Sequence, residues 1–137
     1  MKFSTRTTYG LRAMTYLAWE YKNKAPVSLA RIAKDEHLSL AYLERLFVLL
    51  KKEKLVKAER GAGGGYVLTE APDKMNVFRI VKALEGDVVP FHCINAKGQV
   101  KCSSKEKCGA SNVLMNVYVA ISLTLKKMKL EDLVKSS

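Results

Sequence analysis

The chain has 137 residues, 48% of them hydrophobic and 27% charged, a balance that favours a globular protein and excludes a largely disordered one. Its formal net charge of +11 favours a polyanionic partner, nucleic acid or an anionic membrane, although surplus charge also serves solubility. No apolar run approaches the roughly 20 residues needed to cross a bilayer, and the start lacks a hydrophobic signal core. We therefore expect a cytoplasmic protein with no membrane contact.

Apolar residues recur near the 3.6-residue period from about Ser4 or Thr5 to about Tyr21, which predicts a first helix. The stretch 23–26 contains a proline and ends it. Ser28 is a natural N-cap for a short second helix over 29–36.

His37 and Leu38 are predicted to form a tight turn, after which Ser39 caps a third helix that runs to about Lys52. Its inner face carries Leu43, Leu46, Phe47 and Leu50. A short helix, a tight turn and a second helix predict a helix-turn-helix. In such a motif the helix starts at Ser28 and Ser39 would meet phosphates without reading sequence.

Two short strands are predicted next, over 54–60 and 66–69, because the first alternates in polarity and the second matches it as a return partner. Between them lies a loop with four glycines in five residues, 61–65. Glycine lets this loop turn sharply and lie close to a phosphodiester, so we count Gly61, Gly63 and Gly64 as candidate DNA contacts. A helix-turn-helix followed by a hairpin predicts a mostly α, winged helix-turn-helix fold.

A fourth helix is predicted over 77–85, capped by Asn76 and stopped by Gly86. Ser111 then caps a long helix that runs to about Lys127. Its face is broad for a helix at the end of a small domain, because it joins two neighbouring stripes: Val113, Val117, Ile121 and Thr124, and Leu114, Tyr118, Ile121 and Leu125. A second copy of the chain would cover this face, which predicts a homodimer. Packing of this face on its own domain is the alternative. We expect a DNA-binding domain over 1–86 and a dimerisation helix with its tail over 111–137.

The stretch between them, the cysteine segment (residues 87–110), shows no sustained period and is expected to be a loop. It contains all three cysteines of the chain, Cys93, Cys102 and Cys108. Thiolates bind soft metals, and three of them on a loop can hold an iron–sulfur cluster or a zinc ion. An odd number of cysteines argues against a disulfide framework. Lysines between them would lower the thiol pKa values and offset the charge of a thiolate-bound group.

Three stretches of this sequence resemble the Rrf-two family of bacterial winged-helix regulators: the opening Met-Lys-Phe-Ser-Thr-Arg-Thr-Thr-Tyr-Gly-Leu, the helix 38–46 and the glycine-rich wing 60–66. The resemblance covers almost the whole chain and implies a dimeric transcription regulator that binds a palindromic operator. It places Ala41, Tyr42, Glu44 and Arg60 at positions that meet DNA. Glu44 can accept a hydrogen bond from a cytosine amino group, and Arg60 can enter a narrow minor groove. Arg45 would add a phosphate contact or remain a solvated charge.

The resemblance also implies an iron–sulfur cluster held by Cys93, Cys102 and Cys108, with the two-iron or four-iron type undetermined. The chain departs from the family in its fourth ligand. IscR-like members have a histidine where this chain has Ser111, and NsrR-like members have a carboxylate where it has Thr8. His92 is the only imidazole nearby. The fourth ligand, the signal and the choice between repression and activation therefore stay open.

Two other functions are weighed against this one. An enzyme is disfavoured, because the two histidines, His37 and His92, fall in a turn and a loop with no visible nucleophile–base pair. A winged-helix regulator or protein-interaction adaptor with a zinc-stapled or metal-free cysteine segment is the remaining alternative.

Overall fold

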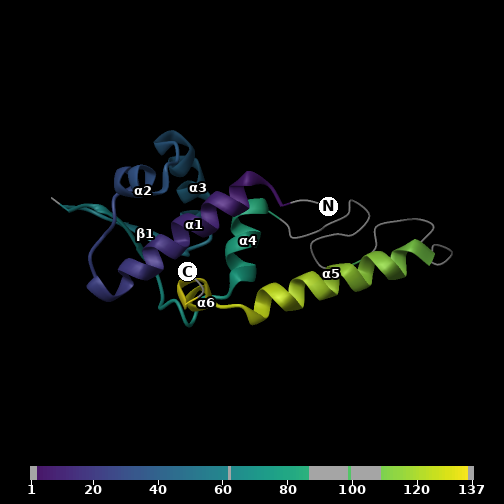
Figure 1. Cartoon of the computed structure of the whole chain (residues 1–137). Helices are drawn as coiled ribbons and strands as arrows, with labels where there is room; N and C mark the ends of the chain where they lie inside the picture. The colour runs from purple at the N-terminus through teal and green to yellow at the C-terminus, as the bar shows by residue number, and fades with distance from the viewer. Residues whose placement is uncertain (1–2, 62, 87–98, 100–108, 136–137) are drawn as a thin grey trace.

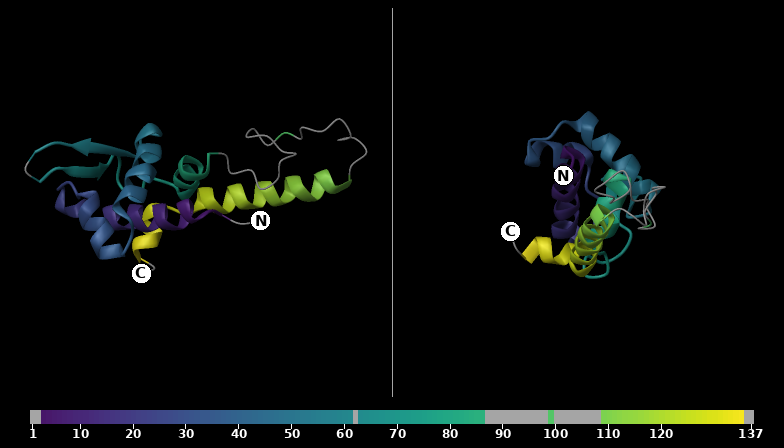
Figure 2. Two further views of the ribbon diagram at one scale, coloured as in Figure 1. Left: turned by 90° about the horizontal axis from the view of Figure 1, so that it is seen from above. Right: turned by 90° about the vertical axis from the view of Figure 1, so that its right-hand side faces the viewer.

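The computed structural model describes residues 3–61, 63–86, 99 and 109–135 (Figure 1). Within them the chain is mostly helical with one small antiparallel sheet, and the hairpin and the long helix α5 lie at opposite ends of the molecule (Figure 2). The elements are α1 (Thr5–Glu20), the 3-10 turn η1 (Tyr21–Asn23), α2 (Leu29–Glu36), α3 (Leu40–Lys52), β1 (Val56–Glu59), β2 (Gly65–Leu68), α4 (Val77–Glu85), α5 (Gly109–Lys127) and α6 (Leu130–Lys135).

Three helices begin where the sequence predicts, because a short polar side chain satisfies a free backbone N–H three residues later. The Oγ of Ser28 accepts from the N–H of Arg31 at 3.1 Å, and the Oγ of Ser39 accepts from that of Tyr42 at 3.3 Å. In the same way Asn76 Oδ1 caps α4. The helix-turn-helix of α2 and α3 is thereby confirmed.

The first helix ends earlier than predicted. Tyr21 lies in the 3-10 turn η1, with 39% of its surface exposed, instead of in the buried stripe of α1. The reason is local: the chain tightens after Glu20, and Lys24 then takes a left-handed φ of 52° that ends the helical path.

The predicted hairpin is confirmed, with Val56 opposite Leu68 and Glu59 opposite Gly65. Its first strand begins at Val56 and not at Lys54, because Lys54 has a φ of 59° and still closes the end of α3. The hairpin is tied to the chain before α2, where Val27 and Tyr66 exchange two backbone hydrogen bonds of 3.0 and 2.8 Å. These elements form a winged helix-turn-helix.

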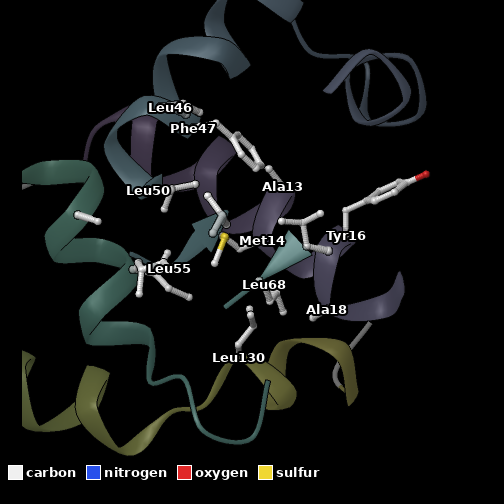
Figure 3. Close-up of a cluster of buried hydrophobic side chains, with 14 of the residues drawn as sticks. Ala13, Met14, Tyr16, Ala18, Leu46, Phe47, Leu50, Leu55, Leu68 and Leu130 are labelled. Carbon is white, nitrogen blue, oxygen red and sulfur yellow. The ribbon is translucent and has the colours of Figure 1, made fainter. Parts of the chain in front are cut away.

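One main core fills the space between α1, α2, α3, the hairpin and α4 (Figure 3). Met14 of α1, Ile32 of α2 and Phe47 of α3 have no exposed surface. Leu130, in the short helix α6, is also fully buried in this core, so the end of the chain returns to pack beside α1. The sequence showed only a tail there.

The long helix α5 begins at Gly109, two residues before the predicted cap Ser111. Ala110, a strong helix former, continues the helix towards the N-terminus. Near its C-terminal end, Ile121 and Leu125 pack against Val77 and Val81 of α4. Part of the face predicted to bind a second copy therefore packs on its own domain, whereas Val113 of that face remains exposed (61%). Val119 (44%) and Leu123 (51%), on the side of α5 away from Ile121, are exposed as well. Of the described helices, none has the length and apolar content that a membrane span requires.

Candidate nucleic-acid interface

The beginning of α3 presents a row of exposed side chains. Ala41, Glu44 and Arg45 are exposed, while Leu43 and Leu46 on the opposite face are buried in the main core. This split follows from the helical period, because residues three and four positions apart share one face. The core therefore determines which side of α3 faces outward, and that side carries the residues predicted to read bases.

An open depression lies beside this row, formed by the start of α1, the turn after α2 and the first turns of α3. Arg45 supplies a cation and Ser39 a hydroxyl group at its edge. Its lining residues are Thr5, Tyr9, His37, Leu38, Ser39, Ala41, Tyr42 and Arg45. This surface can accept a phosphate backbone, which carries negative charge and hydrogen-bond acceptors.

Tyr42 is fixed in this depression by two residues of α1. Its ring meets the ring of Tyr9 edge to face, at 5.8 Å between centroids and an interplanar angle of 86°. Its hydroxyl lies 3.3 Å from the hydroxyl of Thr5. Edge-to-face pairs of this kind are favourable beyond simple burial. The side chain of Tyr42 is therefore held in one orientation before any ligand arrives.

The wing, which is the β1–β2 hairpin and its loop, carries a second cation and glycines that let the backbone turn and pack closely. Arg60 is exposed at its root, and Gly61 has a φ of 126°, which a residue with a side chain rarely adopts. Gly65 serves a different purpose: a Cβ there would lie 2.3 Å from the carbonyl oxygen of Val27. Gly65 therefore anchors the hairpin to Val27, while Gly61 turns the loop.

Among the described arginines outside this surface, Arg6 makes no ion pair with a described residue, and the other three are paired with glutamates. Arg12 pairs with Glu36, Arg31 with Glu20 and Arg79 with Glu70. Arg45 and Arg60 make no ion pair with any described residue.

The sequence-predicted DNA residues thus fall on the start of α3, the start of α2 and the wing. Ser28 and Ser39 use their hydroxyl oxygens as helix caps, so their contribution to phosphate binding comes with the N–H groups of the same helix starts. Thr5, Tyr9 and His37 are additional residues of the depression that sequence reasoning missed. Tyr9 was hidden in the apolar stripe of the first helix, and His37 carried no signal besides its place in the turn.

Behind this surface, the start of α1 is attached to the end of α4 by one carboxylate. Glu85 Oε1 accepts from the backbone N–H of Ser4 at 2.8 Å, from the Ser4 hydroxyl at 2.6 Å and from the Thr7 hydroxyl. Burial alone would raise the pKa of Glu85, but the hydrogen bonds from Ser4 and Thr7 outweigh it and lower this pKa below its usual 4.5.

The predicted metal site lies outside the described residues, since Cys93, Cys102, Cys108 and His92 all belong to the stretches that are not described. In the portions of the chain that are described, no group of three or more His, Cys, Asp or Glu side chains is placed to hold a metal ion. The fit of a metal therefore rests on the donor set itself. Three thiolates suit an iron–sulfur cluster or zinc.

A sequence profile of the Rrf2 family, described as an iron-dependent transcriptional regulator, matches residues 3–136. The chain belongs to the Rrf2 family. CymR of Bacillus subtilis is 36% identical over 133 residues, which cover 97% of this chain and 89% of CymR. IscR of Cereibacter sphaeroides is 34% identical over 138 residues, which cover 99% of this chain and 88% of that IscR.

Solved structures of this Rrf2 family match as well. B. subtilis CymR, described as the global cysteine regulator of that bacterium, matches with a TM-score of 0.80 and 33% identity, over 100% of this chain and 98% of CymR. IscR of T. potens matches with a TM-score of 0.76 and 34% identity, over 99% of this chain and 88% of that IscR. The winged-helix fold and the resemblance are confirmed. The chain is a DNA-binding transcriptional regulator and, like its relatives, not an enzyme.

Proposed function

We propose that this Rrf2-family regulator is a homodimer that reads a palindromic operator and holds an iron–sulfur cluster through its three cysteines. The observation that carries the DNA-reading part is one surface with an outward-facing α3 and two arginines, Arg45 and Arg60, free of ion pairs among the described residues. Unpaired exposed cations are available to phosphates and to base edges.

Each element of this surface has its own part in reading DNA. The start of α3 enters the major groove, where Ala41, Tyr42 and Glu44 meet base edges and Glu44 accepts from a cytosine amino group. The wing lies along the adjacent backbone, with Gly61, Gly63 and Gly64 close to phosphates and Arg60 in the minor groove. A further set of groups positions the duplex without reading it: Ser28, Ser39, the N–H groups of their helix starts and Arg45.

The exposed apolar face of α5 supports the homodimer. Val119 and Leu123 lie on the side of α5 that faces away from α4, and Val113 is exposed nearer the start of the helix. Apolar side chains along one long helix are the usual material of a two-fold helix–helix contact. Two α3 helices related by such an axis would meet two half-sites about one helical turn apart, which a palindromic operator provides.

The donor set and the family description support the cluster. The cysteines lie within sixteen residues, and the family is described as iron-dependent. When bound, an iron–sulfur cluster supplies sensitivity to oxidants, nitric oxide and iron supply. The chain's own part is to offer Cys93, Cys102 and Cys108 as thiolates, with lysines between them that favour the thiolate form. The fourth ligand, with His92 as one candidate, is left open.

A second candidate function is a regulator whose cysteine segment is metal-free or stapled by zinc. The likeness to CymR favours it, because CymR is described as a regulator of cysteine and covers the whole chain at a TM-score of 0.80. The two candidates share the DNA-reading surface and differ only in what the cysteine segment binds.

Arg60→Ala tests the reading surface. The variant is expected to weaken operator binding by about 1–3 kcal/mol and to relax sequence preference, because a contact in the groove is lost. Lys57→Ala, which removes another exposed cation of the hairpin, is the matched control. It is expected to lower the salt dependence of binding by about one unit of slope without changing preference. Equal, small effects of both variants would contradict the assignment.

Purification without oxygen, followed by metal analysis, tests the cysteine segment. A brown protein that contains iron and sulfide, and that loses both in each of the variants Cys93→Ser, Cys102→Ser and Cys108→Ser, is expected. A colourless protein with stoichiometric zinc would support the second candidate, a regulator whose cysteine segment binds zinc. A protein that binds neither metal would support the metal-free regulator.

A further inference from the structure

The first turns of α1 lie between two elements that are far apart in the sequence. On one side is the end of α4, where Glu85 accepts hydrogen bonds from Ser4 and Thr7. Each of these bonds joins residues about eighty positions apart and ends on a charged acceptor. Hydrogen bonds to a charged group are roughly twice as strong as those between neutral groups.

On the other side of the same turns is the recognition helix. Thr5 meets the hydroxyl of Tyr42 at 3.3 Å, and Tyr9 meets its ring edge to face. Residues 4 and 7 are on one side of α1 and residues 5 and 9 on another, since each position advances by about 100° around a helix. The start of α1 is therefore a spacer, with Glu85 against one side and Tyr42 against the other.

This spacer is stiff, because α1 and α4 approach closely beside Glu85. A Cβ on Gly10 would lie 2.3 Å from Leu84 Cδ1, so the glycine lets Leu84 pack directly against the backbone of α1. Leu84 is fully buried. Closely packed helices move as units and not by gradual deformation.

We infer that Glu85 is a positioning residue for DNA recognition: its hydrogen bonds to Ser4 and Thr7 hold Thr5 and Tyr9 against Tyr42 and so orient the reading side chains of α3. Glu85 is also the last residue of α4, and the cysteine segment begins at residue 87. The inference deepens the proposed DNA-reading function and rests on it.

The experiment uses the full chain and two DNA probes. One is a duplex that the wild-type protein selects from a random-sequence pool, and the other is an alternating copolymer duplex of equal length. Glu85→Ala is compared with Glu70→Ala, which removes another half-buried carboxylate, one that pairs with Arg79, and makes the same change of charge. Glu85→Gln serves as the rescue variant, because its amide oxygen keeps an acceptor at the same place.

Glu85→Ala is expected to lower affinity for the selected duplex roughly 3- to 30-fold, while binding to the copolymer changes by less than about twofold. Glu85→Gln recovers part of the lost affinity for the selected duplex. Glu70→Ala keeps the wild-type ratio of the affinity for the selected duplex to the affinity for the copolymer. Amide hydrogen exchange over residues 40–43 becomes faster in Glu85→Ala than in Glu70→Ala, because Tyr42 loses its fixed neighbours.

Two results would overturn the inference: an unchanged ratio in Glu85→Ala, or an equal fall on both probes that Glu70→Ala reproduces. If Glu85→Ala does not fold, Thr7→Val decides in its place, because it removes one donor, keeps the carboxylate and preserves side-chain shape. The same lowered ratio is then expected, and a wild-type ratio overturns the inference. Failure of the wild-type protein to select any duplex would instead refute the proposed function, and the inference with it.

Discussion

The winged part of the molecule and the helix α5 differ in how they bury their apolar side chains. In the winged part, Phe47, Met14 and Ile32 are fully buried among residues of the same chain, and exposed side chains gather on the reading surface. In α5 only one end packs on α4, and Val113, Val119 and Leu123 remain 44–61% exposed. The first region completes its core with its own residues. The second has an apolar face that a second copy of the chain would cover.

The largest effect should come from the core of the winged part. Phe47→Ala is expected to lower the free energy of unfolding by about 3–5 kcal/mol, because it leaves a cavity where the ring contacts Tyr66 and the rest of the core. Chemical denaturation followed by circular dichroism measures this. Phe78→Ala, a half-buried residue at the α4–α5 contact, is the control and should cost less. An equal loss of stability in both variants would contradict the expectation that the core of the winged part contributes more than the α4–α5 contact.

The next largest effect should appear in α5. Leu123→Glu is expected to turn a dimer into a folded monomer at micromolar concentration, because an unpaired charge in an apolar contact costs several kcal/mol, roughly 3–5. Light scattering after size-exclusion chromatography measures the mass. Tyr21→Glu, which places the same charge at another exposed apolar position, should leave the mass unchanged. A monomeric wild type, or a dimeric Leu123→Glu, would show that this face is complete without a partner.

Two glycines of the wing should differ in their importance for stability, because Gly65 packs against Val27 and Gly63 has open space around it. Gly65→Ala is expected to destabilise the protein by about 1–3 kcal/mol, since its Cβ would lie 2.3 Å from the Val27 oxygen. Gly63→Ala, where nothing lies within 4 Å, should change stability by less than about 0.5 kcal/mol. Thermal unfolding compares the two. Similar melting temperatures would mean that the hairpin is not anchored at Val27.

The smallest effect concerns pH. The pKa of Glu85 in the folded protein lies below its usual 4.5, so its contribution to stability is complete above about pH 4.5 and is lost as the pH falls through the lower folded value. Wild-type protein should therefore lose more stability below about pH 4.5 than Glu85→Gln, whose amide does not titrate. Melting temperatures from about pH 7 down to about pH 3 measure this. Parallel curves for the two proteins would contradict the lowered pKa.

Much of the fold and the outline of the reading surface could be predicted from sequence. The signals were local: a serine or asparagine before an apolar period starts each capped helix, and a glycine-rich turn between two short strands makes a hairpin. The starts of β1 and α5 and the end of α1 were misplaced by up to three residues. These ends depend on single backbone angles, such as the φ of 59° at Lys54, for which lysine itself gives no signal.

The candidate site was predicted only in part, because its depression is assembled from three elements. Tyr42 and Arg45 were identified from their place on α3, whereas Thr5 and Tyr9 reach the same surface from the start of α1. Nothing in the periodicity of α1 distinguishes a tyrosine that packs inward from one that supports a neighbouring helix. The predicted division of the chain at residues 86 and 110 stays a prediction, as do the cysteine ligands.

The amino-acid order alone determined the kinds of element, their sequence and the surface charge, since caps, periods and turns act over a few residues. Only the packed structure decided that Leu130 completes the main core, that Gly65 lies against Val27, and that Glu85 binds the start of α1. Each of these contacts joins residues separated by 38 to 81 positions or by several elements. Such contacts form when the helices have packed, and no short pattern of residues encodes them.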